Sequence, residues 1–247
     1  MTTVCLTVDV EDFYDGMAEI GERLERPAQA RSGLEGLAQR LEDVSGGATV
    51  TLFVVGNYLD RVRTGLERLV AGGHEVGSHG PDHGHLPEEQ GKLVAWLRAG
   101  REMIEDRVQV PVRGFRSPRF DTPQGLGLDR YREALAQAGF EYVSDRSFLG
   151  AGSPVRELPV LHRFGYPMGG GSYQRMLPAA AVDIAVGSSP GPVILYYHSY
   201  DFGATLPAAS SVRSVALAKQ VVGRSRVAGL FARLLEHYGS EACGHVA

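Results

Sequence analysis

Residues 73–83 read Gly-His-Glu-Val-Gly-Ser-His-Gly-Pro-Asp-His, and this stretch decides how the rest of the chain is interpreted. A short strand pattern ends at Ser78, and the imidazoles of His79 and His83 follow four positions apart. On a helical turn, that spacing places two side chains on one face, within reach of one ion. Imidazole is a common ligand for zinc and similar metals, and a third, carboxylate ligand would leave a position open for water. The pair alone is weak evidence, so the other parts of the chain must supply the remaining groups.

Composition and charge exclude several classes of protein. The chain has 247 residues, of which 43% are hydrophobic and 22% charged, as expected for one soluble globular domain over residues 1–247. The formal net charge of -4, without a local Lys/Arg cluster, gives no reason to expect a nucleic-acid partner. No apolar run is long enough to cross a bilayer, and a strand pattern rather than a signal peptide opens the sequence, so we expect a cytoplasmic protein without a membrane span. The oligomeric state stays open.

Strand and helix patterns alternate along the chain. The expected strands cover residues 4–8, 49–55, 74–78, 112–115, 141–143 and 193–197. The expected helices begin near residues 27, 57, 87 and 125, and a helical tail over 211–238 is split near Gly223. Residues 150–191 show no clear order. Five strand-then-helix units in succession predict parallel strands with helices outside them.

Polar clusters come directly after four of the predicted strands. They begin at Asp9, His79, Arg116 and His198. In a barrel of parallel strands, the loops that follow the strands gather at one face, and active sites are built there. The four clusters are therefore expected to converge on one pocket.

Four motifs, in this order, resemble those of the polysaccharide deacetylases. They read Asp-Val-Glu-Asp-Phe at 9–13, His-Gly-Pro-Asp-His at 79–83, Arg-Ser-Pro-Arg-Phe at 116–120 and Leu-Tyr-Tyr-His at 195–198. This superfamily carries the NodB homology domain and includes carbohydrate esterase family four. The first motif and the glycine-rich stretch at 169–175 are similar to its exopolysaccharide-locus and peptidoglycan-deacetylase-like branch. The resemblance implies an α/β fold, a distorted (β/α) barrel of NodB type with seven or eight parallel strands, and metal-dependent amide hydrolysis.

The resemblance implies one divalent metal ion, with zinc as first choice and cobalt, nickel or manganese as alternatives. His79 and His83 would be ligands together with one carboxylate. Alternation along an extended strand puts Asp9 and Glu11 on one side and favours Glu11. Related sites more commonly use aspartate, and a turn after Asp12 would bring that side chain inward. We therefore expect Asp12 as the ligand, with Glu11 either bonded to a ligand histidine or serving as the alternative ligand.

The other motif residues suit the steps of amide hydrolysis. Asp9 would be the general base, and Arg116 would keep it ionised and oriented. His198 would be the general acid that protonates the departing amine. The loop containing Arg119 and Phe120 would stabilise the oxyanion and contact the substrate.

One position departs from the family pattern. The family often has an acid after its fifth strand that supports the catalytic histidine. Here the available acid is Asp145, shifted by a residue or two. Asp145 is therefore a candidate partner of His198, but the assignment is open.

Three functions compete. The first is removal of an N-acetyl group from an amino sugar in an intracellular glycan precursor or glycosylated metabolite, with a small N-acetylated sugar or glycoconjugate as the partner. The second is hydrolysis of a cyclic amide or ureide, as in allantoinase-like relatives, but those can lack the metal histidines. The third is a non-catalytic glycan-binding protein, against which the intact set of motif residues argues.

Overall fold

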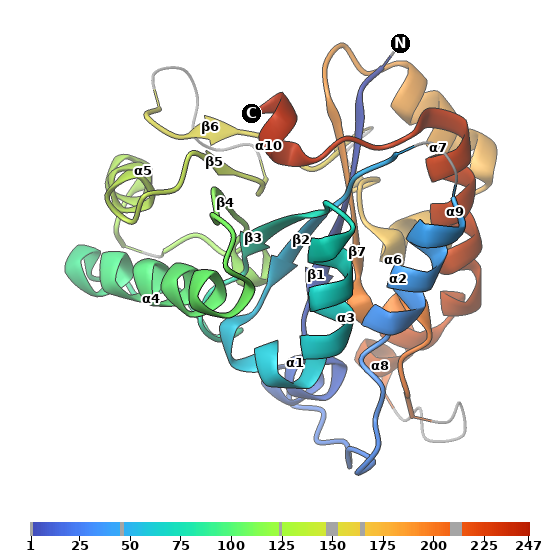
Figure 1. Ribbon diagram of the computed structural model, residues 1–247, viewed down its shortest axis with the longest axis horizontal. Helices are drawn as coiled ribbons and strands as arrows, with labels where there is room; N and C mark the ends of the chain where they lie inside the picture. Colours follow the sequence, from blue (N-terminus) through green and yellow to red (C-terminus); the bar gives the residue numbers. More distant parts are fainter. Residues whose placement is uncertain (1, 45–46, 124, 147–152, 164–165, 208–213) are drawn as a thin grey trace.

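The central element of the fold in the computed structural model is a sheet of seven strands (Figure 1). The structure describes residues 2–44, 47–123, 125–146, 153–163, 166–207 and 214–247. The strand order is β6-β5-β4-β3-β2-β1-β7, and neighbouring strands pair in parallel. The strands are β1 (Val4–Val10), β2 (Thr51–Val54), β3 (Glu75–Ser78), β4 (Gly114–Phe115), β5 (Tyr142–Val143), β6 (Arg156–Glu157) and β7 (Val193–His198).

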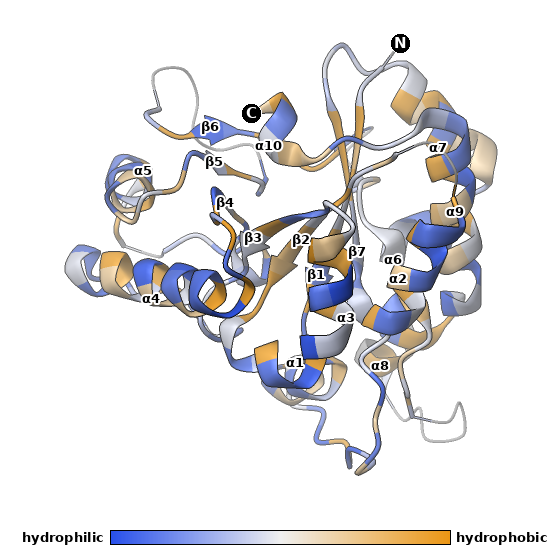
Figure 2. Ribbon diagram, viewed as in Figure 1, coloured by the Kyte–Doolittle hydropathy of each residue, from blue (hydrophilic) through white to orange (hydrophobic). Residues whose placement is uncertain are grey.

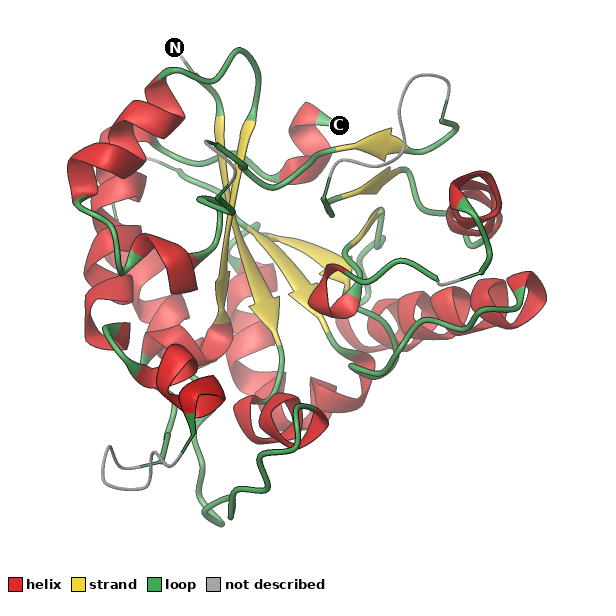
Figure 3. Ribbon diagram, turned by 180° about the vertical axis from the view of Figure 1, so that it is seen from behind, coloured by secondary structure: helices red, strands yellow, loops and turns green. Residues whose placement is uncertain are grey.

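Helices surround the sheet, as the two opposite views in Figure 1 and Figure 3 show. They are α1 (Phe13–Glu19), α2 (Leu34–Asp43), α3 (Leu59–Ala71), α4 (Gln90–Val108), α5 (Leu128–Gln137), α6 (Gly171–Gln174), α7 (Ala179–Gly187), α8 (Val215–Val221), α9 (Val227–Tyr238) and α10 (Cys243–Val246). Short 3-10 turns are η1 (Gly56–Tyr58), η2 (Pro118–Phe120), η3 (Ser199–Phe202) and η5 (Arg224–Arg226). Among the helices of the described ranges, none has the length and apolar character needed to span a membrane.

Alternation along β1 separates the two faces of the sheet. Leu6, Val8 and Val10 belong to the large core that also contains apolar residues of α2, α3 and α4. Cys5 belongs to a second cluster, together with residues of β2, β5 and β7. Figure 2 shows the apolar colouring of the central strands. Because side chains alternate along a strand, Asp9 lies on the same side as Cys5, inside the curl of the sheet.

The segment after β6 links the two edges of the sheet. The Leu158 amide donates to the Val143 carbonyl at 2.9 Å, and the Leu161 amide donates to the Ile194 carbonyl at 2.9 Å. The chain therefore bonds to β5 and then to β7 within a few residues. This curled, linked sheet with helices outside it is a distorted (β/α) barrel, and the predicted fold class is confirmed.

The strands predicted from sequence are all present, with ends shifted by two residues or fewer. The helical tail is split as expected into α8 and α9, with Gly223 at a φ of 71° between them; residues 211–213 of that prediction lie outside the described ranges. Between residues 150 and 191, where no order was predicted, the described residues form β6, α6 and α7. Helix α1 was not predicted, and it begins where a turn was expected.

Candidate metal centre and active site

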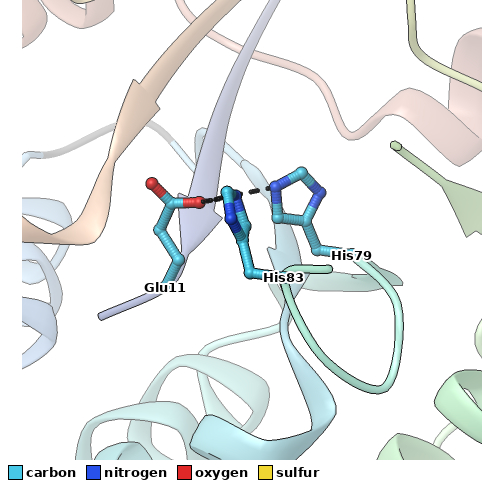
Figure 4. Close-up of side chains that lie close together, drawn as sticks. All are labelled: Glu11, His79 and His83. Carbon is cyan, nitrogen blue, oxygen red and sulfur yellow. Dashed lines mark ion pairs between the residues drawn. The ribbon is translucent and has the colours of Figure 1, made fainter. Parts of the chain in front are cut away.

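Glu11, His79 and His83 lie together where β1 and β3 end, with the carboxylate and both rings turned toward one another (Figure 4). One ligand atom from each lies within 4.8 Å of the others. Oε2 of Glu11 is 2.7 Å from Nε2 of His83 and 3.6 Å from Nε2 of His79. Glu11 and His79 are buried and His83 is half-buried. The cluster therefore offers one carboxylate and two imidazoles to a common point.

The two histidines meet through a bend and not through the predicted helical turn. Residues 79–83 contain no helix. Gly80 has a φ of 87°, a left-handed conformation that favours glycine. A Cβ atom at this position would also collide with the ring of Trp96. The sequence thus predicted the correct pair, but glycine geometry rather than helical periodicity brings the rings together.

The partners of the two Nδ1 atoms decide how the imidazoles are oriented. Nδ1 of His79 lies 2.8 Å from the carbonyl oxygen of Arg116, and Nδ1 of His83 lies 2.8 Å from Oε2 of Glu19. Because both partners are acceptors, we assign the protons to Nδ1, which directs the lone pairs of Nε2 toward Glu11. A carboxylate that faces two such nitrogens requires a cation between them, either a proton or a metal ion. The donor set therefore fits a divalent cation.

The charges around this cluster reinforce that conclusion. Burial would lower the pKa of His83, but the charges and hydrogen bonds of Glu11 and Glu19 outweigh it and raise the pKa to about 10. Burial would likewise raise the pKa of Glu11, yet His83 and His79 hold it well below its usual value. The site thus has a strong preference for positive charge beside Glu11.

Asp12 does not join the cluster, which corrects the expectation that it is the carboxylate ligand. Its Oδ1 atom caps α1 by accepting hydrogen bonds from two backbone amides of the first turn, at 2.7 and 3.2 Å. The same carboxylate pairs with Arg26 at 2.8 Å and with Arg61 at 3.2 Å. Two guanidinium groups and two amides satisfy its charge, and Glu11 lies with the histidines instead.

Asp9 and Arg116 form the expected ion pair beside the cluster. Arg116 is fully buried and donates to Oδ1 of Asp9 at 2.7 Å. It also donates to the hydroxyl of Thr7 at 2.8 Å and to the carbonyl and hydroxyl of Ser144 at 2.8 and 2.7 Å. Its guanidinium lies over the ring of Phe53, 4.2 Å from the centroid. These contacts fix Arg116, which in turn fixes the orientation of Asp9.

His198 ends β7 next to the same cluster. Its Nε2 atom is 3.8 Å from Oε1 of Glu11, and its Nδ1 atom is 3.7 Å from Oδ2 of Asp201. The ring stacks on Tyr200, with 4.7 Å between centroids and 5° between planes. Burial would lower the pKa of His198, but Asp201, Glu11 and Asp9 outweigh it and raise the pKa above its usual value. These neighbours favour a protonated imidazole, as a proton donor requires.

Asp145 supports another part of the site, which corrects its assignment as a partner of His198. Its carboxylate accepts from the amide of Ser117 at 2.8 Å and from the hydroxyl of Tyr131 at 3.1 Å. The acid 3.7 Å from Nδ1 of His198 is Asp201, and the hydrogen bonds of Asp145 go to the loop after β4 and to α5 instead. Asp145 therefore holds the loop after β4, and Asp201 is the acid beside His198.

The loop after β4 has an unusual backbone. Arg119 and Phe120 have φ values of 57° and 56°, in the left-handed region that residues other than glycine rarely adopt. The Arg119 side chain donates to Glu19 at 2.7 Å, and the Phe120 ring packs edge-on against Tyr196 at 4.9 Å between centroids. Both side chains line the cavity that contains the cluster.

Two acids of the site were not predicted from sequence. Glu19 contacts both His83 and Arg119, but it lies in a segment to which no element was assigned and nothing in its surroundings marks it. Asp201 follows His198 by three residues and accepts a hydrogen bond from the His198 amide at 3.1 Å. That spacing, an acid three residues after a strand end, is the signal that could have identified it.

The polar groups line a cavity of about 680 Å³, a volume within the range of small-molecule sites. Asp9, Glu11, His79, His83 and His198 all contribute to its lining. The convergence expected from the four motifs is therefore present in space.

Two family models match the chain. The model described as polysaccharide deacetylase matches residues 45–143, and the model described as a domain of unknown function, DUF3473, matches residues 136–247. The second family is associated with polysaccharide deacetylases. No curated protein matches the chain.

Solved structures share the fold at low sequence identity. A Mycobacterium smegmatis structure assigned to the polysaccharide deacetylases has a TM-score of 0.65 and 17% identity, covering 97% of this chain and 85% of that one. A family 4 acetyl xylan esterase from Clostridium thermocellum, in complex with cobalt, has a TM-score of 0.53 and 14% identity, with 99% and 90% covered. A family 4 pseudoenzyme from Bacillus anthracis has a TM-score of 0.53 and 13% identity, with 99% and 65% covered. The two family models together span residues 45–247, and with the ordered motifs and the barrel they show that the chain belongs to the polysaccharide deacetylase superfamily, a group of deacetylase and esterase hydrolases.

Proposed function

We propose that the chain is a metal-dependent N-deacetylase that acts on an amino sugar in a glycan precursor or a glycosylated metabolite. Water would add to the acetyl carbon, the C–N bond would break, and acetate and a free amine would leave. The observation that carries this proposal is the placement of Glu11, His79 and His83 beside a fixed carboxylate, Asp9, and an imidazole, His198.

One divalent cation fits the carboxylate and two imidazoles described above. When bound, it would supply Lewis acidity at the acetyl carbonyl and make water easier to deprotonate at neutral pH. Zinc is our first choice because its sites commonly combine histidine nitrogen with one carboxylate. Cobalt, nickel and manganese are alternatives, and the cobalt in the Clostridium relative is a precedent for the fold.

The chain's own groups would carry the protons. Asp9, held by Arg116, would take the proton of the attacking water. His198, whose ring stacks on Tyr200 and whose Nδ1 atom faces Asp201, would give a proton to the departing nitrogen. The backbone amide of Arg119 would donate to the oxyanion, since the left-handed turn at this residue redirects the peptide plane near the cavity.

Two alternatives have less support. A metal-free hydrolase of cyclic amides would not need two imidazoles whose Nδ1 atoms are both fixed by acceptors. A non-catalytic glycan-binding protein has a precedent in the Bacillus anthracis pseudoenzyme. That function would not require the buried Asp9–Arg116 pair beside the cluster.

The test is release of acetate and free amine in equal amounts from N-acetyl sugars of one to four units. The protein is purified without chelator, then stripped and reloaded with zinc, cobalt, nickel or manganese. We expect activity that chelator removes and a metal ion restores. Full activity in the stripped protein would contradict metal dependence, and no release from any acetylated sugar by protein with bound metal would contradict the proposed function.

A further inference from the structure

One side of the cavity is apolar and open to solvent. Nine large hydrophobic side chains among the described residues are exposed, and five of these nine line this one cavity. We call these five the apolar wall: Ile20, Tyr173, Met176, Val215 and Val222. Ile20 is 47% exposed, Met176 is 66% exposed and Val222 is 55% exposed. Such a concentration of exposed apolar side chains next to a polar cluster marks a binding surface.

The apolar wall is built on three short helices that the chain brings to one end of the barrel. Ile20 caps the end of α1, Tyr173 lies in α6, and Val222 caps the end of α8. Behind it, a buried cluster joins α1 and α8 through Met17 and Leu217 and includes the Tyr200 ring on which His198 stacks. The wall is therefore a supported surface that continues into the catalytic groups.

The chemistry of the wall does not suit sugar hydroxyl groups. Apart from Tyr173, the wall side chains are aliphatic and offer them no hydrogen bond, whereas exposed apolar area gains free energy when an apolar group covers it. Glu19, which precedes Ile20 in the chain, is paired with Arg119 at 2.7 Å. A ligand that lies along the wall should therefore be apolar where it touches the wall.

We infer that the acetylated sugar of the substrate carries an aliphatic chain, which lies along the apolar wall while the acetamido group reaches the Glu11 cluster. The inference rests on the proposed function and names the substrate class for that same site. The volume of about 680 Å³ is in the range of pockets for drug-sized ligands, so a sugar with part of a chain is a suitable occupant. A glycolipid precursor or an alkylated glycoside has this chemistry.

The experiment compares the methyl and octyl glycosides of N-acetylglucosamine, below the micellar concentration, with zinc-loaded protein. Each buried methylene contributes up to about fourfold in binding, so even a partly buried chain should raise kcat/KM at least about tenfold. Ile20→Asn and Met176→Gln should reduce the octyl-to-methyl ratio at least about threefold. The control variants Ile184→Asn and Met103→Gln change exposed apolar residues outside the cavity and should keep the ratio.

Binding is measured in parallel by calorimetry on the same proteins, with folding checked by thermal melting. Tighter binding of the octyl glycoside, weakened in the wall variants only, supports the inference even if no sugar is hydrolysed and the proposed function fails. Equal affinities and rates for both glycosides would overturn it. So would equal effects of wall and control variants. Wall-dependent binding to sugar-free phosphatidylcholine vesicles without octyl preference would also overturn it, and would identify the wall as a membrane-docking surface.

Discussion

Two acids that are neighbours in the chain lie in opposite surroundings. Glu11 faces the Nε2 atoms of two histidines, whereas Asp12 faces the guanidinium groups of Arg26 and Arg61. Arginine is permanently charged, so the protein itself neutralises Asp12. Imidazole is charged only when it binds a proton, so the charge of Glu11 is available to an external cation. The comparison indicates that the neighbours of an acid, and not its place in a motif, decide whether its charge is available to a cation.

The most direct test of the contrast between Glu11 and Asp12 is to replace each acid in turn. Glu11→Ala should weaken zinc binding by about a thousandfold, since loss of a group outside the ligand shell already costs about 10- to 100-fold. Asp12→Ala should keep zinc affinity within about threefold of wild type. Competition titration with a zinc-binding dye measures both. A metal-free Asp12→Ala protein beside a zinc-binding Glu11→Ala protein would reverse the assignment.

A third acid, Asp145, extends the comparison because its hydrogen-bond donors, the Ser117 amide and the Tyr131 hydroxyl, are both neutral. Burial raises its pKa to about 6, although Ser117, Tyr131 and Arg116 favour the ionised form. Between about pH 4 and 6 the folded state therefore binds more protons at this site than the unfolded state, so stability falls as the pH rises. Relative to Asp145→Asn, the wild type should lose about 2 kcal/mol of unfolding free energy between pH 4 and pH 7.

Urea denaturation of the wild type and Asp145→Asn at pH 4, 5, 6 and 7 checks this expectation. Taking the difference between the two proteins cancels the groups that titrate in both. A difference that does not change with pH would show that Asp145 keeps an ordinary pKa in the folded state.

His198 also lies beside Glu11, and we expect it to be a proton donor rather than a metal ligand. Its Nε2 atom is 3.8 Å from the carboxylate, and its Nδ1 atom faces Asp201. His198→Ala should reduce kcat about a hundredfold, as for loss of a general acid, and leave the bound zinc content unchanged. His162→Ala is the control, since that exposed histidine does not line the cavity. Loss of zinc from His198→Ala would place it among the ligands instead.

The sequence predicted the central strands well because their apolar residues form continuous runs and polar residues follow their ends. The same patterns located His79, His83, Arg116 and His198. Strand alternation also favoured Glu11, but the resemblance outweighed it. The missed signal was helix α1: Asp12 is an N-cap residue, a role for which aspartate is among the best side chains. The glycine inside this seven-residue helix hid its periodicity.

The other errors concern information that a linear pattern does not contain. Asp145 and Asp201 are both acids after strands, and the contacts of Asp145 with Ser117 and Tyr131, which only the folded chain shows, assign it to another part of the site. β6 is two residues long, too short for any periodicity. The contact of Glu19 with His83 depends on how α1 docks over the histidine loop. These features follow from tertiary packing rather than from local sequence.

Because Asp12 pairs with Arg26 and Arg61, its removal is expected to change stability rather than metal binding. Asp12→Ala removes a helix cap and two ion pairs to a buried carboxylate, so it should lower the unfolding free energy by about 2 kcal/mol. Asp60→Ala is a suitable control because that exposed acid has one ion pair, with Arg107. It should cost less than about 1 kcal/mol. If urea denaturation shows the same loss of unfolding free energy for Asp12→Ala and Asp60→Ala, the helix cap and the second ion pair of Asp12 do not add to stability.

The smallest expected effect concerns Glu19, which acts on the metal site only through His83. Its carboxylate accepts from Nδ1 of His83 at 2.8 Å, while Nε2 of the same ring faces Glu11. An acceptor behind a ligand histidine fixes the ring and makes the coordinating nitrogen a better donor. Glu19→Gln keeps an acceptor oxygen but removes the charge, so zinc affinity should fall about tenfold.

Asp121→Asn is the matched control for Glu19→Gln. Both acids pair with Arg119, but Asp121 contacts His85 rather than His83. Any effect that runs through Arg119 would appear in both variants, whereas an effect on the ligand ring would appear only in Glu19→Gln. Equal zinc affinities in the two variants would show that the charge behind His83 does not tune the site, and Glu11 alone would then account for its preference for a cation.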